Sequence, residues 1–131
     1  MDDPRTVLVV DDDVASLSGL LELLRDRGYR VTGAATLEAA TRLLDRFLFD
    51  LLVVDLRLGR ANGLDLVARA RRDQPSVPAI VITGFPDEAA EQAVRLLGAD
   101  YVLKPIVPSA LLALVKARLA PATPFRGSYF V

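Results

Sequence analysis

The stretch Val7-Leu8-Val9-Val10-Asp11-Asp12-Asp13 is an uninterrupted apolar run that ends abruptly in three acidic residues. The same change from apolar to polar residues recurs three times. Apolar runs end at Asp55 (after 51–54), at Thr83 (after 80–82) and at Lys104 (after 101–103). Continuous apolar runs of this length are typical of strands buried on both faces of a parallel sheet. Ligands of open parallel α/β sheets bind at the carboxyl ends of the strands, so we expect the residues that end these runs to form one site.

Strand-like and helix-like segments alternate five times along the chain. Apolar residues recur at helical spacing between the strands; Gly28 is suited to end the first helix and Thr36 to begin the second. This alternation predicts an α/β fold, a doubly wound (βα)5 arrangement in which helices cover both faces of a parallel five-stranded sheet. The polar stretch 57–62 is expected to be a loop. The expected strands are 6–10, 30–34, 51–54, 79–82 and 101–103.

The composition narrows the kinds of site that are possible. The 131 residues are enough for one domain, expected over 1–120 and followed by a short tail over 121–131. The chain contains no cysteine and no histidine, which excludes disulfides, thiolate ligands, a histidine base and a histidine phosphate carrier. A bound metal would need oxygen ligands, as suits Mg²⁺ or Mn²⁺.

Charge and hydropathy bear on partners and location. Nucleic-acid-binding domains usually carry a net positive charge, whereas this chain has a net charge of −1. We therefore expect no direct nucleic-acid binding by this chain. The acidic, polar N-terminus is unlike a signal peptide, and no apolar run approaches the ~20 residues of a membrane helix. We therefore expect a cytoplasmic protein without membrane contact. The tail carries three aromatic residues and is expected to be disordered, packed on a surface, or the start of a linker.

Asp11, Asp12 and Asp55 are predicted to crowd together if the first and third strands are neighbours. Three carboxylates in one pocket repel one another, so without a cation at least one pKa should rise. Mg²⁺ prefers oxygen ligands and keeps positions for water or phosphate oxygens, which favours a metal–phosphate site. The alternative is that 11–13 is a solvated turn that caps the first helix.

Asp55 follows four apolar residues, so its carboxylate ends a buried strand. Burying a carboxylate there costs free energy unless it is paired with a positive charge or takes part in a reaction. We interpret Asp55 as a nucleophile toward phosphorus, with Mg²⁺ and Lys104 supplying positive charge and Thr83 donating a hydrogen bond to a phosphoryl oxygen. The alternative is that Asp55 and Lys104 form a purely structural pair.

Four segments at predicted strand ends occur in a distinctive order: VVDDD (9–13), VVDLRLGRANG (53–63), ITG (82–84) and ADYVLKP (99–105). Each is short, but together they resemble the receiver domain of bacterial two-component response regulators, over nearly the whole chain. The resemblance implies flavodoxin-like topology with strand order 2-1-3-4-5.

The resemblance also implies roles in metal and phosphate binding. Asp55 matches the phosphoacceptor, Asp12 the direct Mg²⁺ ligand, and Asp11 an acid that acts on the metal mainly through water. Asp55 and the backbone carbonyl of Arg57 complete the implied protein ligands. Thr83 and Lys104 match the hydroxyl and the ammonium that contact the phosphoryl group; no separate organic cofactor is implied.

A further implication concerns signal output. Tyr101 matches the aromatic switch residue, which turns inward when Thr83 moves toward the phosphoryl group. The surface of the fourth helix, fifth strand and fifth helix would then change and control a partner or homodimerisation. Leu111, Leu112 and Leu114 make this region apolar, and the alternative is that they belong to the core.

This chain departs from the family pattern after the phosphoacceptor. The family often has Met-Pro where this chain has Leu58-Gly59, and loss of the proline is expected to loosen the loop without removing a ligand. Gly63 stands where the family's glycine does. The long side chain of Arg57 is expected to shield the acyl phosphate from water.

The implied function is a phosphorylation-activated switch of a two-component phosphorelay, not a metabolic enzyme. Its expected partner is a sensor histidine kinase or a histidine phosphotransfer protein. One alternative is a receiver-like scaffold that binds proteins without using phosphate. Another is an aspartyl-phosphate hydrolase of the haloacid-dehalogenase type, which has a second Asp where this chain has Arg57.

Overall fold

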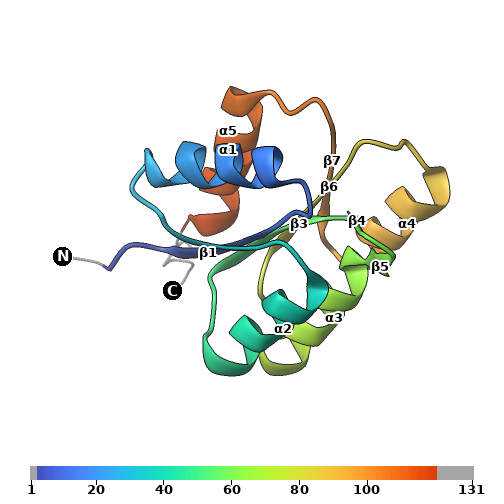
Figure 1. Cartoon of the computed structure of the whole chain (residues 1–131), viewed down its shortest axis with the longest axis horizontal. Coiled ribbons are helices and arrows are strands. Elements are labelled where there is room, and N and C mark those ends of the chain that lie inside the picture. Colours follow the sequence, from blue (N-terminus) through green and yellow to red (C-terminus); the bar gives the residue numbers. More distant parts are fainter. Residues whose placement is uncertain (1–2, 121–131) are drawn as a thin grey trace, which may run out of the picture.

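The computed structural model describes residues 3–120, so the tail 121–131 lies outside the described residues. Strands and helices alternate in the order expected from the sequence (Figure 1). The elements are β1 (Thr6–Val10), α1 (Val14–Arg25), β2 (Arg30–Ala34), α2 (Leu37–Arg46), β3 (Leu51–Asp55), β4 (Arg57–Leu58), β5 (Ala61–Asn62), α3 (Gly63–Asp73), β6 (Ala79–Thr83), α4 (Glu88–Leu96), β7 (Asp100–Leu103) and α5 (Pro108–Leu119).

Five of the strands form one parallel sheet in the order β2-β1-β3-β6-β7. This is the order 2-1-3-4-5 when only the strands of the main sheet are counted, so the predicted fold class and topology are confirmed. The register aligns the strand ends, because Val10 pairs with Val54 and Asp55 with Ile82. Residues that follow β1, β3, β6 and β7 therefore gather at one edge.

The helices form a layer on each face of the sheet. Helices α1 and α5 cover one face, and α2, α3 and α4 cover the other (Figure 1). In β1, Val7 and Val9 face the first layer, whereas Leu8 and Val10 face the second. Side chains of a strand alternate between faces, so a strand covered on both sides must be apolar throughout. That requirement explains the uninterrupted apolar runs of the sequence.

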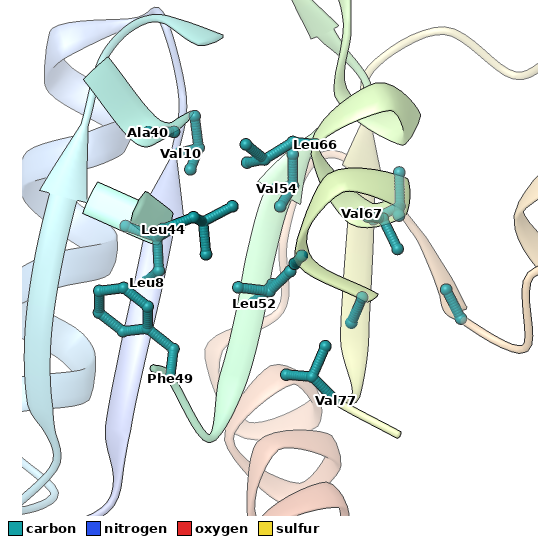
Figure 2. Close-up of a cluster of buried hydrophobic side chains, with 14 of the residues drawn as sticks. Leu8, Val10, Ala40, Leu44, Phe49, Leu52, Val54, Leu66, Val67 and Val77 are labelled. Carbon is teal, nitrogen blue, oxygen red and sulfur yellow. The ribbon is translucent and has the colours of Figure 1, made fainter. Parts of the chain in front are cut away.

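The core beneath α2 and α3 holds the central strands in place. Figure 2 shows Leu44 of α2 and Leu66 of α3 among the side chains of β1 and β3. Val54, the residue before Asp55, belongs to this cluster and has no exposed surface. The backbone that carries the Asp55 carboxylate is thus fixed by packing on both sides.

The helix ends follow the predicted signals. Thr36 caps α2 by accepting a hydrogen bond from the backbone N–H of Ala39. Gly28 follows α1 with φ = 89°, a left-handed conformation that ends helices. Within residues 3–120, no helix is both long and apolar enough to cross a bilayer.

The stretch 57–62 differs from the irregular loop expected from its polar sequence. It forms an antiparallel hairpin in which Arg57 pairs with Asn62 and Leu58 with Ala61. Leu58 is buried in the core beneath α2 and α3, which anchors the hairpin. Gly59 and Arg60 make a two-residue turn, and Gly59 has φ = 62°, as short hairpins require. The polar composition concealed the hairpin because only Leu58 is fully buried.

Candidate functional site

Three carboxylates meet at the carboxyl ends of β1 and β3. Asp11 and Asp12 follow β1, and Asp55 ends β3, its neighbour in the sheet. One carboxylate oxygen of each residue lies within 4.8 Å of the other two. Asp11 and Asp55 are only 2% and 8% exposed, whereas Asp12 is open to solvent. The strand order thus brings together the three acids that the sequence singled out.

Asp13 has a different environment although it is the next residue. Its Oδ2 accepts hydrogen bonds from the hydroxyl and the backbone N–H of Ser16, at 2.7 and 3.1 Å, so it caps α1. These bonds, the hydroxyl's foremost, lower the pKa of Asp13. The capping interpretation therefore applies to Asp13, while its two predecessors turn toward Asp55.

Lys104 supplies the positive charge at this edge. It follows β7, and its Nζ lies 3.1 Å from Oδ2 of Asp55 and 3.5 Å from Oδ2 of Asp11. Burial by itself would lower the pKa of Lys104, but the hydrogen bond and charge of Asp55, together with Asp11, raise it above its usual value. One ammonium therefore bridges two nearly buried carboxylates.

The charge of the site is not balanced by Lys104 alone. Burial raises the pKa of Asp11 above its ordinary value of 3.8, and the nearby Asp55 carboxylate raises it further. The hydrogen bond from the Asp13 backbone N–H and the charge of Lys104 act in the opposite direction without cancelling the rise. The site thus keeps an excess of negative charge that a cation would relieve.

Thr83 ends β6, the strand next to β3, and Tyr101 lies within the next strand, β7. Thr83 has no exposed surface, and its Oγ1 accepts a hydrogen bond from the backbone N–H of Phe85 at 3.1 Å. The Tyr101 ring packs against the core beneath α2 and α3. Its hydroxyl is buried and has no hydrogen-bond partner among the described residues. The hydroxyl is thus enclosed in this structure, and the turn of the ring upon phosphorylation, which the family resemblance implies, stays a prediction.

Comparison with known proteins identifies the family of the chain that carries these site residues. The chain matches the response regulator receiver domain over residues 7–116. It belongs to that family. The alginate biosynthesis transcriptional regulatory protein AlgB of Pseudomonas putida is 38% identical to it over 111 residues, which are 84% of this chain and 25% of that protein. The chain thus spans about a quarter of that relative's length.

Solved structures show the same receiver fold. A CheY-like response regulator receiver domain protein from Methanospirillum hungatei has 30% sequence identity and a TM-score of 0.84, with 89% of this chain and 94% of that chain covered. A response regulator protein from Burkholderia pseudomallei has 31% identity and a TM-score of 0.76, with 88% and 73% covered. The latter structure contains a phosphorylated aspartic acid, a calcium ion and citrate.

The donor set of this receiver domain fits a hard divalent cation. Oxygen ligands at about 2.0–2.1 Å from Mg²⁺ lie at most ~4.2 Å apart, so oxygens within 4.8 Å of one another need only small shifts or one bridging water. Three carboxylates and one ammonium also have a net negative charge, which a divalent cation would neutralise. Asp11, Asp12 and Asp55 can therefore share a Mg²⁺ or Mn²⁺ ion.

Arg57 and Phe85 face each other beside Asp55, at the carboxyl-end edge of the sheet. The Arg57 guanidinium carbon lies 4.4 Å from the centroid of the Phe85 ring, a cation–π contact. The backbone N–H of Arg57 also donates to Oδ1 of Asp55 at 3.3 Å. The contact joins the loop after β3 to the loop after β6. The sequence placed Arg57 near the site but did not indicate that it pairs with Phe85.

Two glycines shape the site in ways that the sequence did not reveal. A Cβ atom on Gly63 would lie 2.2 Å from the backbone oxygen of Asp55, so only glycine allows α3 to start this close to β3. The backbone N–H of Gly59 donates to Oδ2 of Asp12 at 2.8 Å. Neither contact has a local sequence signal, because each joins segments that the fold brings together.

Proposed function

We propose that this receiver domain is a phosphorylation-activated switch that accepts a phosphoryl group on Asp55. The observation that carries the proposal is the Asp55 carboxylate at a buried strand end, with Lys104 Nζ at 3.1 Å and oxygens of Asp11 and Asp12 within 4.8 Å. A carboxylate held beside an ammonium and a cation-binding acid pair suits attack on phosphorus. The phosphorylated aspartic acid in the structure of the Burkholderia relative supports the same chemistry.

Asp55 would act as the nucleophile, on a phosphohistidine of a sensor histidine kinase or a histidine phosphotransfer protein. An Asp55 oxygen forms a bond to phosphorus, the phosphorus–nitrogen bond breaks, and its electron pair stays on the imidazole nitrogen. A bound Mg²⁺ or Mn²⁺ would neutralise charge on the phosphoryl oxygens. Lys104 and Thr83 contact the same group, the former as a point charge and the latter as a hydrogen-bond donor.

The residues that would hold the metal are Asp12 and Asp55 directly, Asp11 through water, and Arg57 through its backbone carbonyl. This division is the one that the family resemblance implies, and the position of Asp12 supports its part in it, because Asp12 is open to solvent and can exchange water for a metal. Arg57 begins β4, two residues beyond Asp55, which brings its backbone close to the acids.

Phosphorylation adds a group of about −1.5 to −2 charge next to Lys104. That charge draws in the Thr83 hydroxyl, whose O–H is free to donate to a phosphoryl oxygen while its oxygen accepts from the Phe85 N–H. Tyr101 responds to the space that Thr83 leaves. The population then shifts toward a different surface on α4, β7 and α5, where a partner binds or a second copy docks.

Location and partners follow from the same proposal. A domain that takes phosphate from a histidine kinase works where the kinase's catalytic part lies, which we take to be the cytoplasm. The chain acts on proteins, not on nucleic acid or on metabolites. Its only covalent chemistry would be its own phosphorylation and slow dephosphorylation.

The decisive experiment is incubation with Mg²⁺ and acetyl phosphate, followed by intact-mass measurement. The natural chain should gain one phosphoryl group only when Mg²⁺ is present, and Asp55→Asn should gain none. A folded protein that gains no phosphoryl group from acetyl phosphate or from a panel of histidine kinases would favour the scaffold alternative. Gain of phosphate by Asp55→Asn would move the site away from Asp55.

A further inference from the structure

The hydrogen bond from Gly59 to Asp12 joins two segments that are 47 residues apart. Its donor is the backbone N–H of the β4–β5 turn, and its acceptor is the Oδ2 atom of Asp12 in the loop after β1. Among residues 3–120, this is the only hydrogen bond that the Asp12 side chain makes. An exposed carboxylate would otherwise rotate freely, so this bond determines its direction.

The turn is built so that this N–H points toward Asp12. Gly59 is the first residue of a two-residue hairpin turn, and its φ of 62° is open to glycine but unfavourable for L residues. Leu58 is buried and anchors one side of the turn. A Cβ on Gly59 would meet nothing within 4 Å, so glycine is needed here for the backbone conformation and not for space.

We propose that the Gly59 N–H is a positioning group for the metal site, which holds Asp12 oriented for Mg²⁺. The inference rests on the proposed function, because it takes Asp12 as a direct ligand. One oxygen of Asp12 accepts the N–H bond and the remaining lone pairs stay free for the cation. Hydrogen bonds to metal-ligating carboxylates orient them in this way, and their loss typically costs about 10–100-fold in metal affinity.

The departure of this chain from the family's common Met-Pro pattern then has a specific consequence. A proline at position 59 would have no N–H to donate. Loss of the proline was expected to loosen the loop without removing a ligand; the glycine at that position also donates a hydrogen bond to Asp12. Mg²⁺ binding and the order of the hairpin should therefore depend on each other.

The test replaces Gly59 by D-proline or by D-alanine in chemically synthesised full-length chains. Both D residues favour positive φ and so keep the turn, but only D-alanine keeps the N–H. Mg²⁺ affinity is measured by calorimetry, and thermal unfolding without Mg²⁺ reports whether the turn is intact. We expect the D-proline chain to bind Mg²⁺ about tenfold more weakly than the D-alanine chain, at equal metal-free stability.

Equal Mg²⁺ affinities for the two variants would overturn the positioning role, even if phosphorylation of Asp55 proceeds normally. Failure of the natural chain to bind Mg²⁺ at all would overturn both this inference and the proposed metal site. A second measurement needs no turn variant. In the natural chain, the Gly59 amide NMR signal should be protected from exchange, shift during Mg²⁺ titration and lose its protection in Asp12→Ala. Free exchange of that amide in the natural chain would also overturn the inference.

Discussion

At the scale of single residues, the ammonium of Lys104 and the carboxylate of Asp11 show how the site balances its charges. Lys104 lies 3.1 Å from Asp55 and 3.5 Å from Asp11, so it partly neutralises two acids at once. Burial nevertheless raises the pKa of Asp11. A proton and a metal ion are therefore alternative ways of reducing the negative charge around Asp11.

Mg²⁺ should stabilise the protein more at neutral pH than at acidic pH. Because the pKa of Asp11 is raised in the folded state, its contribution to stability is fully present below the unfolded value of 3.8 and is lost as pH rises through the folded pKa. Mg²⁺ offsets that loss at higher pH but must displace the proton at lower pH. Thermal unfolding with and without Mg²⁺, from about pH 4 to about pH 8, measures the difference.

The control for this pH dependence is Asp11→Asn, which keeps the shape but cannot ionise. Its Mg²⁺-induced rise in Tm should change less with pH than that of the natural chain. The same pH dependence in both proteins would show that Asp11 is not the group that competes with the metal.

The Arg57–Phe85 contact should slow the loss of phosphate from Asp55. The pair joins the segments after β3 and β6 beside Asp55, the proposed phosphoacceptor, with 4.4 Å between the guanidinium carbon and the ring centroid, and would limit the approach of water. Arg57→Ala and Phe85→Ala should each speed dephosphorylation several-fold, and the double variant should add little. Intact-mass time courses after removal of acetyl phosphate give the rates.

Arg60→Ala is the matched control for the Arg57 variant. Arg60 is exposed in the same hairpin, and among the described residues it makes no side-chain hydrogen bond or ion pair. Its replacement should leave the dephosphorylation rate unchanged. If it speeds the loss of phosphate as much as Arg57→Ala does, general positive charge and not the contact with Phe85 protects the phosphate.

At the scale of elements, the β4–β5 hairpin and the start of α3 shape the loop that carries the site. Leu58 anchors the hairpin in the core, and Gly63 brings α3 against the backbone of Asp55. The Asn62 side chain accepts a hydrogen bond from Leu64 N–H and so caps α3. The eight residues after β3, 56–63, thus contain a turn, the backbone N–H that bonds to Asp12 and the start of a helix.

Gly63→Ala should destabilise the fold, while Gly19→Ala should not. A Cβ on Gly63 meets the Asp55 backbone oxygen at 2.2 Å, so the backbone must shift, at a cost of about 1–3 kcal/mol. A Cβ on Gly19, within α1, meets nothing within 4 Å, and its gain in helix propensity should stabilise by about 0.5–1 kcal/mol. Urea unfolding gives both values. Equal stability of the two variants would contradict the close approach at Gly63.

At the scale of the whole molecule, α4, β7 and α5 border the β7 edge of the sheet, whereas the acids lie at the carboxyl ends of β1 and β3. Leu111, Val115 and Leu119 of α5 are buried, so they belong to the core and not to the surface of α4, β7 and α5. Its exposed apolar side chains are instead Leu96 and Leu103, which are 84% and 44% exposed. Of the two alternatives left open by the sequence, Leu111 thus belongs to the core, while Leu112 and Leu114 are half-buried against it.

Phosphorylation should favour a dimer or a partner complex through this surface, and Leu96→Arg should weaken it without blocking phosphorylation. Leu96 lies at the end of α4, remote in sequence from every proposed ligand of the phosphoryl group. Analytical ultracentrifugation of the phosphorylated and unphosphorylated forms measures self-association. Leu48→Arg, at another exposed leucine between α2 and β3, is the control. Loss of association in the control alone would place the interface elsewhere.

Much of this molecule could be predicted from its amino acids alone. Strands buried on both faces must be apolar throughout, so the runs before Asp11 and Asp55 marked a doubly wound parallel sheet. In such a sheet the strand ends share one edge, so the residues after the runs had to lie near one another. Asp12, Thr83 and Lys104 were found at that edge for the same reason.

The tertiary structure decided what local sequence does not encode. Asp12 and Asp13 are identical neighbours, yet one faces Gly59 and the other caps α1. Their directions depend on partners 47 and 3 residues away, and only folding brings the distant partner into place. Arg57 likewise pairs with Phe85 because β3 and β6 are adjacent. Residue spacing sets which strand ends meet, but side-chain directions depend on contacts between distant segments.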